Sequence, residues 1–240
     1  IEMDDLDRVQ ARAVADPAWF WSAAVDDLGL DWQRRPRETL DLARGVPWAR
    51  WWGGGAFNWA AAAIGPHGEG ADDDVAVAWE GEDGTVRTLA RAELRAAVDR
   101  AAGALATIGV GPGTRVGIFL PMLLETVVAV LAIARLGAVF TPIFSGYAAP
   151  AVASRLQAFE ATHLVTADGF LRRGQTIRLK ATADEALRDA PTVKRALVVQ
   201  RLGPDTGAPW SPARDTWWHE AVAAAPPPPP VVDTDPETPY

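Results

Sequence analysis

The sequence contains no cysteine, and this absence excludes several kinds of chemistry. Without a thiol the chain has no disulfide, thiolate nucleophile, zinc–thiolate site or iron–sulfur cluster. The three histidines, His67, His163 and His219, are too widely spaced to predict a metal site. We therefore predict no metal-binding residue in this chain.

The sequence is also poor in positive charge and in long apolar runs. Its 23 Lys and Arg residues are outnumbered by 31 Asp and Glu, which leaves a net charge of -8. This balance argues against a nucleic-acid-binding protein, because phosphate contacts need clustered basic side chains. The most apolar run, residues 126–134, is too short to span a bilayer, and the acidic N-terminus lacks a secretory signal. We predict a cytoplasmic protein with no nucleic-acid or membrane partner.

Tryptophan and proline, by contrast, are abundant. Eight of the 11 tryptophans precede residue 80, and five consecutive prolines occupy residues 226–230. We predict that residues 1–70 form a helical, Trp-rich N-terminal appendage, with helices at 18–28 and 57–64. Its tryptophans either pack the appendage onto a larger body or stack on a ligand, and their helical spacing favours packing.

In the following 150 residues, segments whose apolar residues have the spacing of a strand alternate with segments that have the spacing of a helix. Strands are predicted at 74–80, 85–89, 115–120, 138–144, 162–166 and 196–200, and helices at 91–108, 122–136, 149–159, 183–189 and 216–225. Strands and helices that alternate through short loops form βαβ units. The fold class is therefore α/β, with a largely parallel sheet flanked by helices in residues 71–222. Residues 223–240 are predicted to be a Pro-rich extended segment.

Motifs of common catalytic sites are missing. The sequence has no G-x-x-x-x-G-K-[ST] loop, no G-x-S-x-G elbow and no H-E-x-x-H pair, so we predict no catalytic residue in this chain. Residues 109–113 are glycine-rich, but they follow a helix and precede a strand, which is the wrong order for a dinucleotide site and indicates a connecting turn. The three acids at 72–74 are either a cation site or a solvated turn, and we favour the turn.

The strongest charge feature is the basic segment 172–180, which carries four positive charges in nine residues. It follows the strand predicted at 162–166, and loops at the carboxyl ends of parallel strands are where such sheets bind ligands. Guanidinium groups also suit phosphate. From the residues alone, a solvated basic loop remains the favoured alternative to a phosphate site.

Several segments, taken in order, resemble one known family. The resemblance is to the N-terminal portion of the acetyl-CoA synthetase branch of the AMP-forming acyl-CoA synthetases, members of the adenylate-forming enzyme superfamily. It covers about residues 16–220 and rests on Asp16-Pro17-Ala18-Trp19-Phe20-Trp21, on residues 51–60, on Glu93-Leu94, on residues 109–118 with Leu120-Pro121, on residues 136–147 with Arg155-Leu156, and on residues 166–169 with 172–174.

The resemblance implies the fold of the N-terminal subdomain of these enzymes and a partial coenzyme A (CoA) site. The loop that meets the CoA 3′-phosphate region corresponds to Arg172, Arg173, Gly174 and Gln175. The turn that contains Gly146 and Tyr147 corresponds to one close to the pantetheine path. Gln175 stands where relatives often have a second arginine, a change that would weaken phosphate binding.

The resemblance also implies what the parent protein does. Such a parent uses a small carboxylic acid, ATP and CoA, forms an acyl-adenylate and pyrophosphate, and then forms acyl-CoA and AMP. Its ATP and Mg²⁺ sites are expected beyond Tyr240, so we expect this N-terminal fragment to be inactive by itself. There are two alternatives. The fragment is a non-catalytic structural domain that carries the surface through which a homo-oligomer forms, or it is an isolated CoA-binding module.

Overall fold

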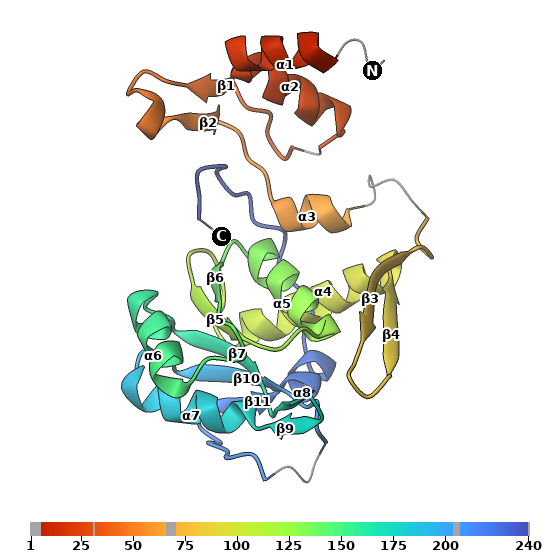
Figure 1. The fold of residues 1–240 in the computed structure, drawn as a ribbon, viewed down its shortest axis with the longest axis vertical. Helices are drawn as coiled ribbons and strands as arrows, with labels where there is room; N and C mark the ends of the chain where they lie inside the picture. Colours follow the sequence, from red (N-terminus) through yellow and green to blue (C-terminus); the bar gives the residue numbers. More distant parts are fainter. Residues whose placement is uncertain (1–5, 31, 66–70, 204–206, 240) are drawn as a thin grey trace. The chain divides into compact units, whose positions relative to one another are not determined.

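The computed structural model describes residues 6–30, 32–65, 71–203 and 207–239 (Figure 1). These residues form two compact units: one contains residues 6–65 with 233–239, and the other contains residues 71–232. The predicted boundary at residue 70, His67 and Tyr240 lie outside the described residues. Each unit is described separately below.

The N-terminal unit combines short helices with a β-hairpin. Its elements are α1 (Leu6–Ala15), α2 (Pro17–Asp27), β1 (Glu38–Asp41), the 3-10 helix η2 (Val46–Trp48), β2 (Arg50–Gly53) and α3 (Trp59–Ile64). Asp16 caps α2 by accepting a hydrogen bond from Trp19 N at 3.0 Å, so the predicted helix is present. The antiparallel β1–β2 pair was not predicted, because strands of four residues carry too little alternation to be recognised.

Aromatic rings fill the middle of this unit. Trp32 lies 5.5 Å from Trp52 and 5.1 Å from Phe57, measured between ring centroids. The C-terminal residues 233–239 join the unit, since Phe57 N donates to Thr234 O at 2.9 Å. Trp32 and Trp52 therefore stabilise the N-terminal unit from within, through tilted ring contacts.

The larger unit is built on a five-stranded parallel sheet. Its strand order is β11-β10-β7-β5-β6, with bounds β5 (Arg115–Phe119), β6 (Val139–Pro142), β7 (His163–Ala167), β10 (Arg195–Val199) and β11 (Asp215–Trp217). One face is covered by α4 (Arg91–Thr107), α5 (Leu124–Arg135) and α8 (Trp218–Ala223), and the other by α6 (Ala149–Ala158) and α7 (Leu179–Asp189) (Figure 1). The predicted α/β class is confirmed.

Two antiparallel hairpins accompany the sheet. The first, β3 (Val75–Glu80) with β4 (Val86–Ala90), was predicted from the turn residues between its strands. The second, β8 (Phe170–Arg172) with β9 (Gln175–Ile177), was not predicted. Helix α7 begins four residues before its predicted start, and the segment predicted as one helix at 216–225 begins with strand β11.

The core lies between the sheet and its helices, and apolar strand and helix residues are buried completely there, among them Val116, Phe119, Ile133, Leu156, Leu164 and Leu197. The Pro-rich segment packs on the outside of α4 and α5: Arg135 Nη1 donates to Pro229 O at 2.7 Å. Within the described ranges, no helix has the length and apolar character needed to cross a membrane.

Candidate functional site

The carboxyl edge of the parallel sheet has a cleft at its topological switch point. After β5 the chain adds β6 on one side and then returns to place β7 on the other side of β5. The loops that leave neighbouring strands therefore diverge there, which is where open α/β sheets bind ligands. The space between these loops measures about 300 Å³ and is called the switch-point cleft below; it is lined by residues 79–82, 121–123, 144–145, 170–172 and Arg201.

The β8–β9 hairpin brings the predicted phosphate loop to the rim of this cleft. Arg172 pairs with Gln175 across the hairpin, and the two residues of its turn, Arg173 and Gly174, have φ values of 52° and 72°. Two successive left-handed residues make the tight turn that matches the twist of paired strands. We call residues 172–175 the hairpin tip.

Arg172 does not extend freely from the hairpin tip. Its guanidinium carbon lies 5.6 Å from the centroid of the Phe144 ring, and the side chain is half-buried. Gly146 permits this approach, because a Cβ there would lie 2.8 Å from Arg172 Nη1 and 2.5 Å from Phe144 Cε1. The structure thus brings Gly146 and Arg172, which are distant in sequence, into one place.

Tyr147 belongs to the same aromatic group. Its ring meets Phe144 edge-on at 5.5 Å between centroids, and the Arg155 guanidinium lies 4.2 Å above it. The predicted residues Gly146, Tyr147 and Arg172 therefore surround Phe144, while Arg173, Gly174 and Gln175 are exposed at the hairpin tip. Sequence reasoning did not select Phe144 as a site residue, although it lies within segment 136–147, which carried the resemblance.

The β3–β4 hairpin forms the other wall of the cleft. Trp79 Nε1 donates to Met122 O at 2.7 Å, and the Arg201 guanidinium lies 5.2 Å from the Trp79 ring. Arg201 also pairs with Asp83 at 2.8 Å. The hydrogen bonds from Arg201 and from Thr85 N lower the pKa of Asp83 to about 2, so this carboxylate stays ionised.

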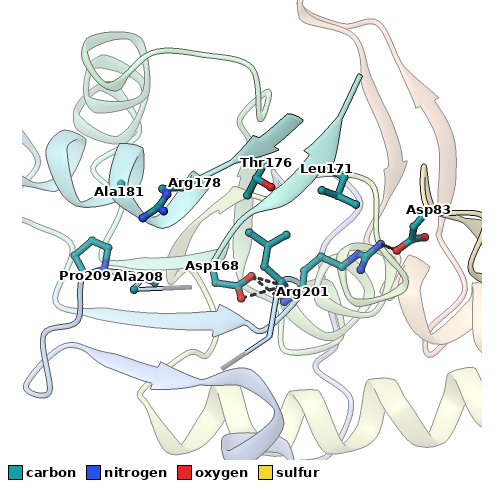
Figure 2. Close-up of a pocket in the computed structure, with 11 residues that line it drawn as sticks. Asp83, Asp168, Leu171, Thr176, Arg178, Ala181, Arg201, Ala208 and Pro209 are labelled. Carbon is teal, nitrogen blue, oxygen red and sulfur yellow. Dashed lines mark hydrogen bonds and ion pairs between the residues drawn. The ribbon is translucent and has the colours of Figure 1, made fainter. Parts of the chain in front are cut away.

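A second cavity, of about 560 Å³, lies next to the switch-point cleft and shares Leu171 and Arg201 with it. Figure 2 shows its polar wall, where the Arg201 side chain reaches Asp83 and Asp168 lies close to the Arg201 backbone. Asp168 is buried and accepts hydrogen bonds from Arg201 N at 2.8 Å and Gly169 N at 2.7 Å. This carboxylate therefore fastens the loops after β7 and β10 to each other.

Lys180, at the end of the basic segment, has a different environment from the arginines. Its side chain is completely buried, its Nζ donates to both carboxylate oxygens of Asp184 at 2.7 Å, and it pairs with Asp215 at 2.9 Å. Burial raises the pKa of Asp215, but hydrogen bonds from Arg214 and Lys180 outweigh it and hold that pKa below its ordinary value. The interpretation of residues 172–180 as a solvated loop is therefore wrong for Lys180.

Two other candidate motifs make ordinary structural contacts. In the acidic run at 72–74, Asp72 pairs with Arg95, and Asp74 accepts a hydrogen bond from Ala71 N at 2.8 Å. The glycine-rich segment 109–113 connects α4 to β5, and Gly113 N donates to Gly137 O at 2.9 Å. In the part of the chain that the structure describes, no three His, Cys, Asp or Glu side chains are grouped to hold a metal ion.

The fold is α/β with a cleft at the carboxyl edge of its parallel sheet, and sequence comparison identifies the family of the chain. Residues 67–240 match the sequence model of the AMP-binding enzyme family, and residues 6–63 match that of the acetyl-coenzyme A synthetase N-terminus. The first match covers more than half of the chain, which therefore belongs to the AMP-binding enzyme family.

Individual relatives agree with this assignment. Acetyl-coenzyme A synthetase of Streptomyces coelicolor is 42% identical over 210 residues, which are 87% of this chain and 32% of that protein. The Deinococcus radiodurans protein of the same name is 37% identical over 236 residues, 98% of this chain and 36% of that protein. Acetoacetyl-CoA synthetase from Streptomyces lividans superimposes with a TM-score of 0.81 at 28% identity, over 92% of this chain and 33% of that one. The chain spans about a third of the length of these proteins.

Proposed function

We propose that the hairpin tip and the adjoining turn bind the nucleotide end of CoA. Arg172 would contact the 3′-phosphate, the tip residues Arg173, Gly174 and Gln175 would border it, and Gly146 and Tyr147 would lie along the pantetheine path. The observation that carries the proposal is the convergence of Gly146 and Arg172 on the Phe144 ring at the switch-point cleft.

The chemistry of this arrangement suits a phosphorylated ligand. A guanidinium backed by an aromatic ring keeps its direction and loses little conformational entropy when it meets a phosphate oxygen. The turn adds positive charge from Arg173 and an exposed backbone at Gly174. Gln175 offers an amide rather than a guanidinium, so the charge for phosphate recognition would come from Arg172 and from Arg173 beside it.

We further propose that the parent protein is a cytoplasmic, ATP-dependent, AMP-forming acyl-CoA synthetase that acts on a small carboxylic acid. The relatives named acetyl-coenzyme A synthetase support this proposal, since they match nearly the whole chain. ATP bound with Mg²⁺ supplies the activated phosphoryl centre in such a reaction. The resemblance implies ATP and Mg²⁺ sites in the part of such a parent that this chain does not span, and we propose that they lie there.

A structural or oligomerisation role is the second candidate. Large apolar side chains lie exposed in the N-terminal unit, where Trp48 is 62% exposed and Trp21 is 48% exposed. Tryptophan is enriched at interfaces between proteins, because its ring is apolar and its N–H still finds a partner. Light scattering tests this role, and a monomer at all concentrations would exclude a homo-oligomer.

Calorimetry tests the CoA site directly. For the 240-residue protein we expect tighter binding of CoA than of dephospho-CoA, and we expect Arg172→Ala to weaken CoA binding about 10- to 100-fold, which is the range for a charged hydrogen bond. Arg188→Ala, which removes the same charge from an exposed position of α7, is the matched control. Equal binding of CoA by wild type and Arg172→Ala would refute the proposed phosphate contact.

A further inference from the structure

An acidic side chain of the β3–β4 hairpin faces the hairpin tip. Glu82 Oε2 accepts a hydrogen bond from Gly174 N at 3.4 Å, across 92 residues of sequence. The distance is at the long end for such a bond, so the contact is mainly a carboxylate held close to the peptide dipole of the turn. The same N–H belongs to the tip that is proposed to receive a phosphate.

Glu82 is held in this place by the residues on either side of it. Trp79 is fixed by its hydrogen bond to Met122 O, and Asp83 is fixed by its ion pair with Arg201. The turn between β3 and β4 is closed by Gly81 N, which donates to Thr85 O at 2.9 Å. These contacts fix the backbone of the turn, so the Glu82 side chain starts next to the hairpin tip, where its carboxylate reaches Gly174 N.

From this geometry we infer that Glu82 is an internal competitor for the anion site at the hairpin tip. Its carboxylate occupies the Gly174 N–H and places a negative charge where the 3′-phosphate would approach Arg172. A phosphate that binds there must either displace this carboxylate or be repelled by its charge. Glu82 therefore lowers the affinity of the site for the 3′-phosphate, and it reduces the difference in affinity between CoA and dephospho-CoA. The inference rests on the proposed CoA site.

The charge of Glu82 can be removed without changing its shape. Glu82→Gln keeps an oxygen that accepts from Gly174 N but has no negative charge. We expect this variant to bind CoA about two- to fivefold more tightly, the range for one solvent-screened charge interaction, and to leave dephospho-CoA binding unchanged. The gain should shrink as salt is added, because ions screen exposed charges.

Glu80→Gln is the matched control. Glu80 also lines the switch-point cleft and is exposed, but among the described residues it has no hydrogen bond to the hairpin tip. If Glu80→Gln tightens CoA binding as much as Glu82→Gln does, the effect is one of net charge, and the assignment to Glu82 is overturned. A Glu82→Gln variant that binds CoA no better than wild type overturns it as well.

A measurement on the protein without added ligand separates this inference from the CoA proposal. The amide proton of Gly174 should shift in an NMR titration as the Glu82 carboxylate is protonated, and this shift should vanish in Glu82→Gln. If Arg172→Ala weakens CoA binding but the Gly174 amide does not respond to Glu82, only the competitor role fails. If Arg172→Ala has no effect, the CoA site itself fails and the competitor role fails with it.

Discussion

Lys180 and Lys194 are the only lysines of the chain, and they differ in burial. Lys194 is exposed, whereas Lys180 is completely buried and joins Asp184 of its own helix to Asp215 of β11. A buried charge is tolerated only where it is paired and hydrogen-bonded, because removal from water costs several kcal/mol. Lys180 is therefore a structural residue that binds α7 to the edge of the sheet.

Replacing this lysine with an apolar side chain of similar length should destabilise the fold. In Lys180→Met the carboxylates of Asp184 and Asp215 keep Arg214 as their only basic partner among the described residues, and one charge is left without compensation. We expect the free energy of unfolding to fall by about 3 kcal/mol in urea denaturation, the lower end for a broken buried pair. Lys194→Met is the control and should change it by less than about 0.5 kcal/mol. Equal stability of the two variants would contradict this account.

At the scale of the elements, the Pro-rich segment packs closely against helix α4. The carbonyl oxygen of Pro226 lies so close to α4 that a Cβ at Gly103 would approach it to 2.2 Å. Glycine inside a helix costs about 1 kcal/mol relative to alanine, so its presence there needs a reason. Close packing of the Pro-rich segment against the helix supplies that reason.

Gly103→Ala tests this packing, because helix propensity and steric fit predict opposite changes in stability. Alanine favours the helix more than glycine does, whereas its methyl group would collide with the Pro-rich segment. If the segment packs as described, the added methyl group must push it away, and we expect a net loss of about 1–3 kcal/mol in the free energy of unfolding. Gly111→Ala, where a Cβ would meet nothing within 4 Å, is the matched control and should be nearly neutral. A more stable Gly103→Ala protein would show that the segment does not rest on α4.

At the scale of the whole molecule, the chain corresponds to about a third of its relatives. Its described residues provide the sheet, the switch-point cleft and the hairpin tip. Adenylate formation needs the phosphates of ATP to be held and their charge neutralised. The proposed CoA site at one edge of the sheet would not by itself supply these functions.

We therefore expect the 240-residue chain, incubated with ATP, Mg²⁺ and acetate or other short acids, to release no pyrophosphate. A coupled pyrophosphate assay measures this, and the acetyl-coenzyme A synthetase of Streptomyces coelicolor serves as the positive control. Pyrophosphate release above the background of a heat-denatured sample would mean that the chain carries an adenylation site of its own, and the proposed division of functions would be wrong.

The long elements of the larger unit were predictable because local signals define them. Helix α4 shows a regular apolar period and ends before Gly109, whose φ of 97° suits glycine. Strand β5 is a run of apolar residues between a turn and a proline. The hairpin β8–β9 was missed because three-residue strands carry no readable period, and its Arg173-Gly174 turn places a bulky residue in the left-handed region.

The sequence by itself determined the α/β class, the order of the main strands and helices, and the family, since periodicity, glycine stops and ordered motifs are local properties of the chain. Only the tertiary structure decided which charged groups meet. Whether Lys180 is buried depends on Asp215, and whether Glu82 faces Gly174 depends on how two hairpins close over one cleft. Such pairings join residues far apart in the chain, and they form only when the sheet fixes the loops at its carboxyl edge.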